Sequence, residues 1–199
     1  MRTGYLSRLT DAYRVILMDY PPADIDASSF TPDRVSADML SIADAAGADR
    51  FAWFGFSWGG VVGLQLAART DRLTALICGG WPPIQAPYAQ MLLVTEALAA
   101  KMPQAEMMVT YYRGLLNWRE RDARLTFPRL AFAGSDDTVM AVEGQRTPIG
   151  PLIVQHKDEL EAMGWTVRLV EGFGHELVNR PDVVVPLIRE FLDSLRLSR

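Results

Sequence analysis

A serine flanked by small residues stands between two uncharged segments of different character. The segment Phe51 to Phe56 is short and aromatic, which is typical of a buried parallel strand, and the apolar residues after Gly59 favour a buried helix. The motif Gly55-Phe56-Ser57-Trp58-Gly59 therefore predicts a nucleophilic serine on a sharp strand-to-helix turn. Side chains at Gly55 and Gly59 are expected to collide with neighbouring backbone.

Two later segments offer the partners that a nucleophilic serine needs. Arg129 to Gly134 is strand-like and is followed closely by Asp136 and Asp137, and Thr166 to Glu171 is strand-like and leads to a glycine-containing turn before His175. A histidine can take the serine proton, and a carboxylate can hold the imidazole in the correct tautomer. Spacing alone leaves both adjacent aspartates open as the acid.

The order of serine, acid and histidine, each after a strand, resembles the α/β-hydrolase family. The resemblance implies that Ser57 is the nucleophile, His175 the base and Asp137 the acid, because the family's acid usually stands three residues after the glycine that ends its strand. It also implies that the backbone N–H of Trp58 is an oxyanion donor, and that neither a metal nor an organic cofactor is needed. Asp136 then becomes a turn residue bonded to nearby backbone amides.

The remaining pattern alternates strands with helices, which predicts an α/β fold with a mostly parallel sheet flanked by helices. The chain of 199 residues is expected to form a single domain, residues 1–199. Thr31 is a plausible N-cap of a helix that ends near Gly47. The other expected elements are strands at Arg14 to Asp19 and Thr74 to Cys78 and helices at Leu152 to Met163 and Val185 to Leu195.

Residues 81–124 interrupt this alternation with two apolar helix-like stripes where one crossover helix is expected. The resemblance implies a helical cap insertion here, although the stripes could also simply pack against the sheet. In a cap, Met and aromatic side chains would adapt to an apolar substrate. The candidate pocket residues are Trp58, Trp81, Met91, Met108 and Tyr112. Arg119 to Asp122 are expected to form a solvated hinge.

The resemblance covers nearly the whole chain, but the segments with which the family's domain normally begins are not found here. The second oxyanion donor of the family comes from a loop that typically opens with His-Gly, and no such sequence precedes Ser57. The family's first three strands have no counterpart, and one of them would lie between the strands at Arg14 to Asp19 and Phe51 to Phe56. We expect either direct pairing of these two strands or an N-terminally shortened chain, and we favour shortening because Met1 opens inside a helix-like segment.

Charge and hydropathy limit the classes of partner. The net charge is −4 and no Lys/Arg cluster is present, so we expect a small-molecule substrate and no nucleic acid. The N-terminus lacks the apolar region of a signal peptide, which favours a cytoplasmic location. The uncharged run Phe51 to Ala68 contains glycines, a serine and a glutamine that suit a strand, turn and helix better than a membrane span. A monomer or a homodimer is expected, the latter through an unpaired strand edge.

Two further residues are expected to be structural. Cys78 is the only cysteine, which excludes an internal disulfide and favours a buried strand thiol. His156 is flanked by polar residues and is expected to be a solvated helical side chain.

The leading functional hypothesis is a serine hydrolase that cleaves an ester or related acyl compound with an apolar acyl or aryl group. A proline-iminopeptidase-like activity is an alternative, but it would need clustered carboxylates for the substrate amine, and the cap offers only Glu96 and Glu106. C–C bond hydrolysis and cofactor-free oxygenation also occur on this scaffold. From a different class, the chain could be a catalytically silent ligand-binding or interaction protein.

Overall fold

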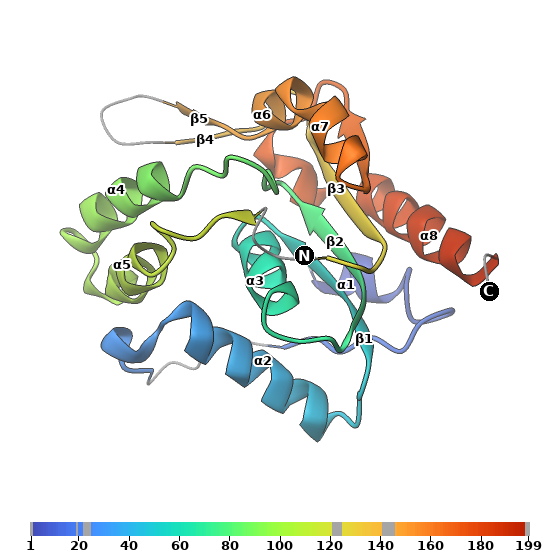
Figure 1. Cartoon of the computed structure of the whole chain (residues 1–199), viewed down its shortest axis with the longest axis horizontal. Coiled ribbons are helices and arrows are strands. Elements are labelled where there is room, and N and C mark those ends of the chain that lie inside the picture. Colours follow the sequence, from blue (N-terminus) through green and yellow to red (C-terminus); the bar gives the residue numbers. More distant parts are fainter. Residues whose placement is uncertain (1, 19, 22–24, 121–124, 141–145, 198–199) are drawn as a thin grey trace.

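The computed structural model describes residues 2–18, 20–21, 25–120, 125–140 and 146–197. At its centre is a four-stranded parallel sheet in the order β1-β2-β3-β6. The strands are β1 (Phe51–Phe56), β2 (Leu73–Gly79), β3 (Arg129–Gly134) and β6 (Trp165–Val170). Helices cover both faces of this sheet, as Figure 1 shows. The prediction of an α/β fold with a mostly parallel sheet is confirmed.

The two faces of the sheet are covered by different helices. One face packs against α2 (Pro32–Ala45), α3 (Trp58–Ala67), α6 (Gly150–Gln155) and α7 (Lys157–Ala162). The opposite face packs against α8 (Pro181–Leu197) and the short α1 (Arg2–Leu6). A second, antiparallel pair, β4 (Thr138–Met140) with β5 (Arg146–Pro148), extends beyond β3. This antiparallel pair was not expected from the sequence.

Burial along the central strands follows the two-residue period of a strand. In β2, Leu76 and Cys78 belong to the core on the α3 side, whereas Ala75 and Ile77 belong to the core on the α8 side. Because both faces are covered, these strands need apolar residues at every position. Cys78 is fully buried, as its position in an apolar run predicted.

Helix α2 has the ends that its sequence predicted. The Thr31 side chain caps it by accepting a hydrogen bond from the Arg34 N–H at 3.2 Å, and Pro32 occupies the first helical position. Beyond the last turn, Gly47 adopts a φ of 61°, a conformation that side chains rarely allow.

Two expected elements differ from the structure. Arg14 to Met18 do not form a strand, and Asp19 lies outside the described residues. A strand needs a hydrogen-bonded neighbour, and within the described part of the chain this segment has none, because β1 pairs with β2 on its other side. The expected helix at Leu152 to Met163 is two helices, interrupted at His156, whose φ is −108° and ψ 18°.

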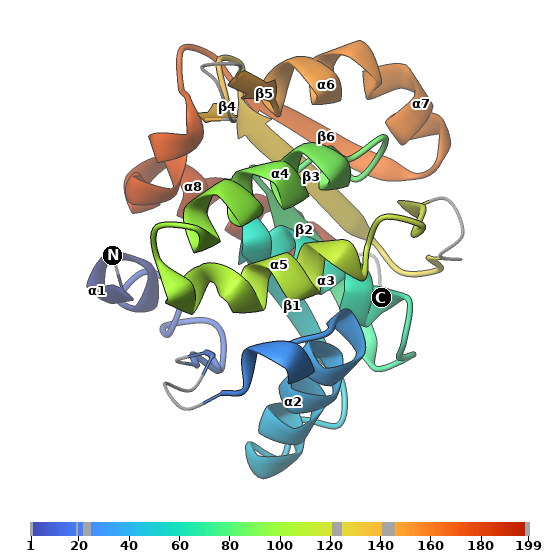
Figure 2. The ribbon, with the colours of Figure 1, turned by 90° about the vertical axis from the view of Figure 1, so that its left-hand side faces the viewer.

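The segment between β2 and β3 contains α4 (Tyr88–Ala99), a short 3-10 helix (Pro103–Ala105) and α5 (Glu106–Arg113). Figure 1 shows α4 and α5 side by side, and Figure 2, which faces them, shows them in front of α3. The expected solvated hinge is wrong at Glu120, which is only 8% exposed. Arg119 is exposed as expected, and Arg121 and Asp122 lie outside the described residues.

Candidate functional site

Ser57 lies on a sharp turn between β1 and α3, with a φ of 55° and a ψ of −121°. Residues other than glycine rarely adopt this backbone conformation, so the surrounding structure must hold it. The Ser57 N–H donates to the Gly79 carbonyl at 2.8 Å, and the Ser57 carbonyl accepts from the Gly60 N–H at 2.8 Å. The turn predicted from the motif is thus present.

The two glycines that flank this turn differ in their surroundings. A Cβ atom at Gly55 would overlap the backbone carbonyl of Gly59, so only glycine fits there. At Gly59 a Cβ atom would meet nothing within 4 Å, so the expected collision at this position is wrong. The Gly59 carbonyl instead accepts a hydrogen bond from the Trp53 indole N–H at 3.0 Å.

The side chain of His175 lies between those of Ser57 and Asp137. Its Nε2 is 2.9 Å from Ser57 Oγ, and its Nδ1 is 2.8 Å from Asp137 Oδ1. An N–H at Nδ1 that donates to the carboxylate leaves Nε2 free to accept the serine hydroxyl proton. Asp137 is fully buried, whereas the His175 side chain is 29% exposed. The histidine is therefore accessible while the carboxylate is shielded from solvent.

Backbone contacts at the end of β3 hold Asp137 in place. Its N–H donates to the Gly134 carbonyl at 3.2 Å, and its own carbonyl accepts from the N–H groups of Ile149 and Gly150, both at 2.9 Å. Because a Cβ at Gly134 would overlap the Phe173 carbonyl, this glycine lets the loop before His175 approach the end of β3. The close approach brings the histidine to the aspartate.

The structure separates the two adjacent aspartates. Asp137 contacts His175, whereas Asp136 is exposed and its Oδ1 accepts a hydrogen bond from Ser135 Oγ at 3.0 Å. Asp136 was expected to bond backbone amides, but its side chain accepts from this hydroxyl instead. Asp137 Oδ2 is buried without a partner among the described residues.

His175 begins a short 3-10 helix (His175–Asn179) and packs against an aromatic ring from β1. The rings of His175 and Phe56 have centroids 5.2 Å apart and an interplanar angle of 58°. The next residue, Glu176, accepts the Gly174 N–H at 2.9 Å, and this hydrogen bond lowers the pKa of the Glu176 carboxyl. The Glu176 side chain thus holds the turn that precedes the histidine.

Trp58, directly after the serine, belongs to an aromatic cluster with Tyr20, Phe30 and Tyr111. Its ring lies nearly parallel to that of Tyr20, with centroids 6.4 Å apart, and meets that of Tyr111 edge-on at 5.5 Å. Because Tyr111 is on α5, the Trp58 indole packs under the helices of residues 81–124. The Trp58 backbone N–H is in the first turn of α3, where amides lack an intrahelical acceptor.

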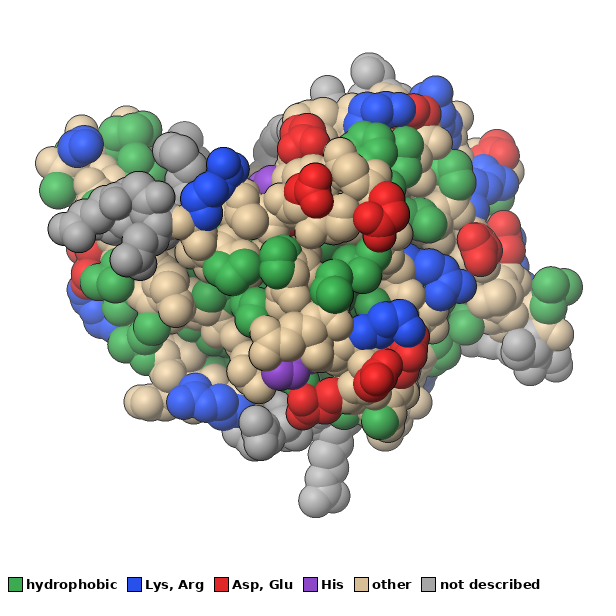
Figure 3. All heavy atoms as spheres, turned by 90° about the horizontal axis from the view of Figure 1, so that it is seen from above, with side chains coloured by type: hydrophobic (Ala, Val, Ile, Leu, Met, Phe, Trp, Pro, Cys, Tyr) green, Lys and Arg blue, Asp and Glu red, His purple; other side chains and the backbone are tan. Residues whose placement is uncertain are grey.

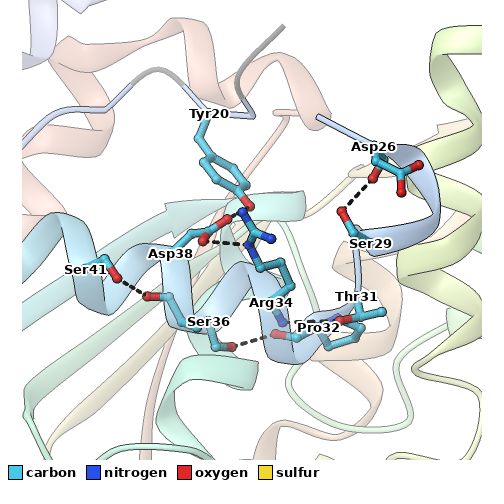
Figure 4. A network of polar contacts seen from close by, with 10 residues as sticks. Tyr20, Asp26, Ser29, Thr31, Pro32, Arg34, Ser36, Asp38 and Ser41 are labelled. Atoms are coloured by element: carbon cyan, nitrogen blue, oxygen red, sulfur yellow. Dashed lines mark hydrogen bonds and ion pairs between the residues drawn. The ribbon is translucent and has the colours of Figure 1, made fainter. Parts of the chain in front are cut away.

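Polar contacts on α2 fix one ring of this aromatic cluster. Figure 4 shows Tyr20, whose hydroxyl donates to Asp38 Oδ2 at 2.8 Å, and Arg34, whose Nε donates to Asp38 Oδ1 at 2.8 Å. Burial, reinforced by the Asp38 hydrogen bond, raises the pKa of the Tyr20 hydroxyl. Sequence reasoning missed Tyr20 and Phe30. Phe30 precedes the Thr31 cap, a position where an apolar residue often packs against the first turns of a helix, and that signal was available.

Two of the other candidate pocket residues, Trp81 and Tyr112, are in ring contact. The Trp81 ring contacts those of Tyr88 and Tyr112, with centroids 5.6 and 6.4 Å apart. Trp81 and Tyr112 are almost fully buried, and Met91 and Met108 are partly buried against the same core cluster. These four side chains thus belong to, or pack against, the apolar core on the α3 side of the sheet.

The second histidine is placed apart from these residues. His156 lies at the break between α6 and α7 with its Nδ1 3.3 Å from Glu159 Oε2. Its side chain is only 12% exposed, so the expectation of a solvated histidine is wrong. Within the described ranges, no cluster of three or more His, Cys, Asp or Glu side chains is arranged to hold a metal ion.

The surface charge and the length of the helices bear on binding to polyanions and to membranes. Figure 3 shows one face of the molecule, on which acidic and basic side chains are interspersed among apolar ones. No helix in the described part of the chain is long and apolar enough to cross a membrane.

Comparisons with known proteins agree with this architecture. The profile of the alpha/beta hydrolase family matches residues 2–190, while no curated protein matches the chain. A thermophilic esterase from Thermogutta terrifontis is similar with a TM-score of 0.68 and 19% identity over 96% of this chain and 84% of the esterase. E-2-(Acetamidomethylene)succinate hydrolase gives a TM-score of 0.62 and 16% identity over 85% of this chain and 76% of that one. A novel epoxide hydrolase from metagenomes of hot environments gives a TM-score of 0.56 and 18% identity over 84% of this chain and 76% of that hydrolase.

Proposed function

The chain belongs to the alpha/beta hydrolase family, and from that membership we propose that it is a serine hydrolase acting on an ester or related acyl compound. The observation that carries the proposal is the pair of hydrogen bonds that His175 makes, to Ser57 at 2.9 Å and to Asp137 at 2.8 Å. A nucleophile, a base and an orienting acid within hydrogen-bond reach are what acyl transfer through a covalent intermediate requires.

Each of the three residues has a separate role in this proposal. Ser57 Oγ attacks the acyl carbon while His175 Nε2 takes its proton, and the protonated imidazole then gives that proton to the leaving alcohol. A water molecule next attacks the acyl-enzyme, His175 takes a proton from the water, and the acid product leaves as the proton returns to Ser57. Asp137 keeps the imidazole in the required tautomer and stabilises its positive charge. This sequence needs no metal or organic cofactor.

The start of α3 supports stabilisation of the negative charge that develops on the acyl oxygen. We assign the Trp58 backbone N–H as one oxyanion donor, because it directly follows the nucleophile in the first turn of α3. The positive end of the helix dipole adds to this effect. An oxyanion donor typically contributes about a hundredfold to a thousandfold to turnover.

The substrate is proposed to carry an apolar acyl or aryl group. Residues 81–124 are proposed to act as a cap, with Trp58, Trp81, Met91, Met108 and Tyr112 near the acyl group, because their side chains are apolar or aromatic and all belong to, or pack against, one core cluster. The peptidase alternative has less support. Glu96, one of its two candidate carboxylates, is paired with Arg113 at 3.1 Å on the surface.

Labelling with a fluorophosphonate probe tests the proposal. The probe reacts with an activated serine, so the unaltered chain should be labelled, and Ser57→Ala and His175→Ala should not be. Ser41→Ala is the matched control, because Ser41 is an exposed hydroxyl on α2 and its removal should leave labelling unchanged. Hydrolysis of p-nitrophenyl butyrate, measured in parallel, should follow the same pattern.

A folded chain that takes no label, or that is labelled equally after Ser57→Ala, would overturn the assignment. The first result would instead favour a ligand-binding protein that keeps the three side chains without turnover. Circular dichroism of each variant separates loss of the activated serine from loss of the fold.

A further inference from the structure

A cavity of about 310 Å³ lies between the segment that leads into α4, the segment that follows α5, and helix α7. The side chains that the argument below uses come from these three places: Ile84 and Tyr88, Leu116, Trp118, Arg119 and Glu120, and Glu159 and Met163. We call this space the Glu120 pocket. The three residues of the proposed active site do not line it. Its volume is near the lower end of ligand-binding cavities, about 300–1,000 Å³, so it suits a small molecule.

Glu120 contributes a buried carboxyl group to the wall of the pocket. The residue is only 8% exposed, and its Oε1 atom is buried without a well-formed hydrogen bond from any described residue. Burial raises the pKa of the carboxyl, although nearby donors, the Tyr88 hydroxyl among them, act in the opposite direction. Carboxylates are almost never buried unless a partner is present. Glu120 thus has room for a hydrogen-bond donor that a ligand can supply.

The Tyr88 hydroxyl is a second buried polar atom beside this carboxyl. Tyr88 is only 5% exposed, and within the described ranges its hydroxyl also lacks a well-formed hydrogen bond. Burial, reinforced by the negative charge of Glu120, raises the pKa of this hydroxyl, so the two groups lie close together. A neutral phenol oxygen can accept a hydrogen bond as well as donate one. One ligand with two N–H groups could therefore donate to both residues.

Aromatic and apolar side chains form other walls of the pocket. The rings of Tyr88 and Trp118, which both line it, meet edge-on with centroids 6.0 Å apart and an interplanar angle of 73°. The faces of aromatic rings attract organic cations. Ile84, Leu116 and Met163 add aliphatic or thioether contacts. These walls suit a ligand that carries a short carbon chain.

The charges around the pocket favour a positive ligand over a negative one. Two carboxylates, those of Glu120 and Glu159, and the guanidinium of Arg119 belong to the described lining. The Arg119 Nη1 donates to two backbone carbonyls of its own segment, at 3.1 and 2.8 Å, which orients it toward that segment. An anion placed against Glu120 would meet a like charge in a poorly solvated site.

We propose that the Glu120 pocket binds a small organic ammonium ion. The ammonium N–H groups donate to Glu120 Oε1 and to the Tyr88 hydroxyl, and the carbon chain packs against Trp118. A metal ion fits less well, because hard cations need several oxygen ligands. Among the residues that the structure describes, no cluster of three or more His, Cys, Asp or Glu side chains is arranged to provide them. This binding is additional to the proposed hydrolysis and does not depend on it.

NMR of the indole N–H groups tests the proposal in the full chain, whose five tryptophans report on different places. The probe is n-butylammonium chloride at pH 7, and 1-butanol is the uncharged probe of similar shape. The ammonium should shift the Trp118 signal in a saturable way. The signal of Trp58, next to the proposed nucleophile, should stay unchanged. Binding of 1-butanol should be weaker by about tenfold or more, because it forms no charge-assisted hydrogen bond.

Two variants and a matched control locate the binding determinants. Glu120→Gln keeps the size of the side chain but removes its charge, so it should weaken n-butylammonium binding by about tenfold or more. Tyr88→Phe removes only the hydroxyl and should weaken it by about threefold or more. Glu161→Gln is the control, because Glu161 is an exposed carboxylate on α7 that is paired with Lys157 at 2.7 Å, and binding should stay within about twofold. Circular dichroism verifies that each variant is folded.

Four results would overturn the proposal. Equal affinity for the ammonium and for 1-butanol, unaffected by Glu120→Gln, would show a merely apolar cavity. Tighter binding of butyrate than of the ammonium would assign the pocket to anions held by Arg119. A saturable shift at Trp58 instead of Trp118 would place the ligand in the proposed active site. The absence of any saturable shift would exclude an ammonium site, and labelling of Ser57 by the fluorophosphonate would be unaffected by that outcome.

Discussion

His175 Nε2 lies 2.9 Å from Ser57 Oγ, although 118 positions separate the two residues in the sequence. Their proximity follows from the parallel sheet, because the loops after β1, β3 and β6 all leave from the same edge. The nucleophile, the acid and the histidine each follow one of these strands. Their relative positions thus depend on strand order and not on local sequence.

Asp137→Asn should lower kcat for p-nitrophenyl butyrate by about 10⁴-fold, because an amide no longer holds the imidazole in the required tautomer. Asp136→Asn is the matched control at the adjacent position. Its side chain is exposed and contacts Ser135, so kcat should stay within about twofold of the unaltered value. Steady-state kinetics measures both variants. If Asp136→Asn lowers kcat much more than Asp137→Asn does, the acid is Asp136.

Gly55→Ala should destabilise the chain by about 3 kcal/mol or more, because the added Cβ overlaps the Gly59 carbonyl and the backbone must move. Gly59→Ala should instead stabilise it by about 0.5–1 kcal/mol, because the site is open and alanine is the better helix former. Urea unfolding of both variants measures the two changes. An equal loss of unfolding free energy in the two variants would contradict the steric difference between Gly55 and Gly59.

Tyr20→Phe should lower the free energy of unfolding by about 1–2 kcal/mol, because it leaves Asp38 with one hydrogen-bond donor fewer. Tyr111→Phe is the control within the same aromatic cluster. The Tyr111 hydroxyl is buried and has no partner among the described residues, so its removal should be neutral or stabilising. Thermal unfolding followed by circular dichroism compares the two, and a larger loss for Tyr111→Phe would be inconsistent with these contacts.

Burial raises the pKa of Glu120 above its ordinary value of 4.5, so the folded chain holds this proton more tightly than the unfolded chain does. The resulting contribution to stability is fully present below pH 4.5 and is lost as the pH rises through the folded pKa. Glu120→Gln cannot ionise. The variant should therefore gain stability relative to the unaltered chain at pH 7, and the gain should shrink as the pH falls toward the unfolded pKa.

Chemical denaturation at a series of pH values measures this difference. Exposed Glu161, paired with Lys157, provides the comparison variant Glu161→Gln, which should not show the same gain at neutral pH. If the stability difference between Glu120→Gln and the unaltered chain does not change with pH, the pKa of Glu120 is not raised by folding.

Several elements could be predicted from sequence because their signals are local. β1 and β3 have the expected bounds, since each is an apolar run that ends at a turn, and α2 begins at its Thr31 cap. Arg14 to Met18 has an equally apolar sequence but is not a strand. Strand formation depends on a partner that is distant in sequence, so local composition cannot decide it.

Residue type and order single out Ser57 and His175 in the candidate site, whereas the choice of Asp137 over the adjacent Asp136 came from the family's spacing, and the structure brings the three side chains together. Tyr20 was missed because its relation to Trp58 depends on how the segment before α2 packs across the sheet. The break at His156 was missed as well, since the apolar pattern continues through it. Tertiary packing overrides local periodicity at both places.

The unusual backbone of Ser57 has a cost for folding as well as a use in chemistry. A φ of 55° disfavours any side chain at this position, and such strain is typically about 1–3 kcal/mol. Ser57→Gly should consequently give a more stable chain that has lost its proposed nucleophile. Selection for thermostability alone would thus tend to discard this serine, and its retention would require selection for activity.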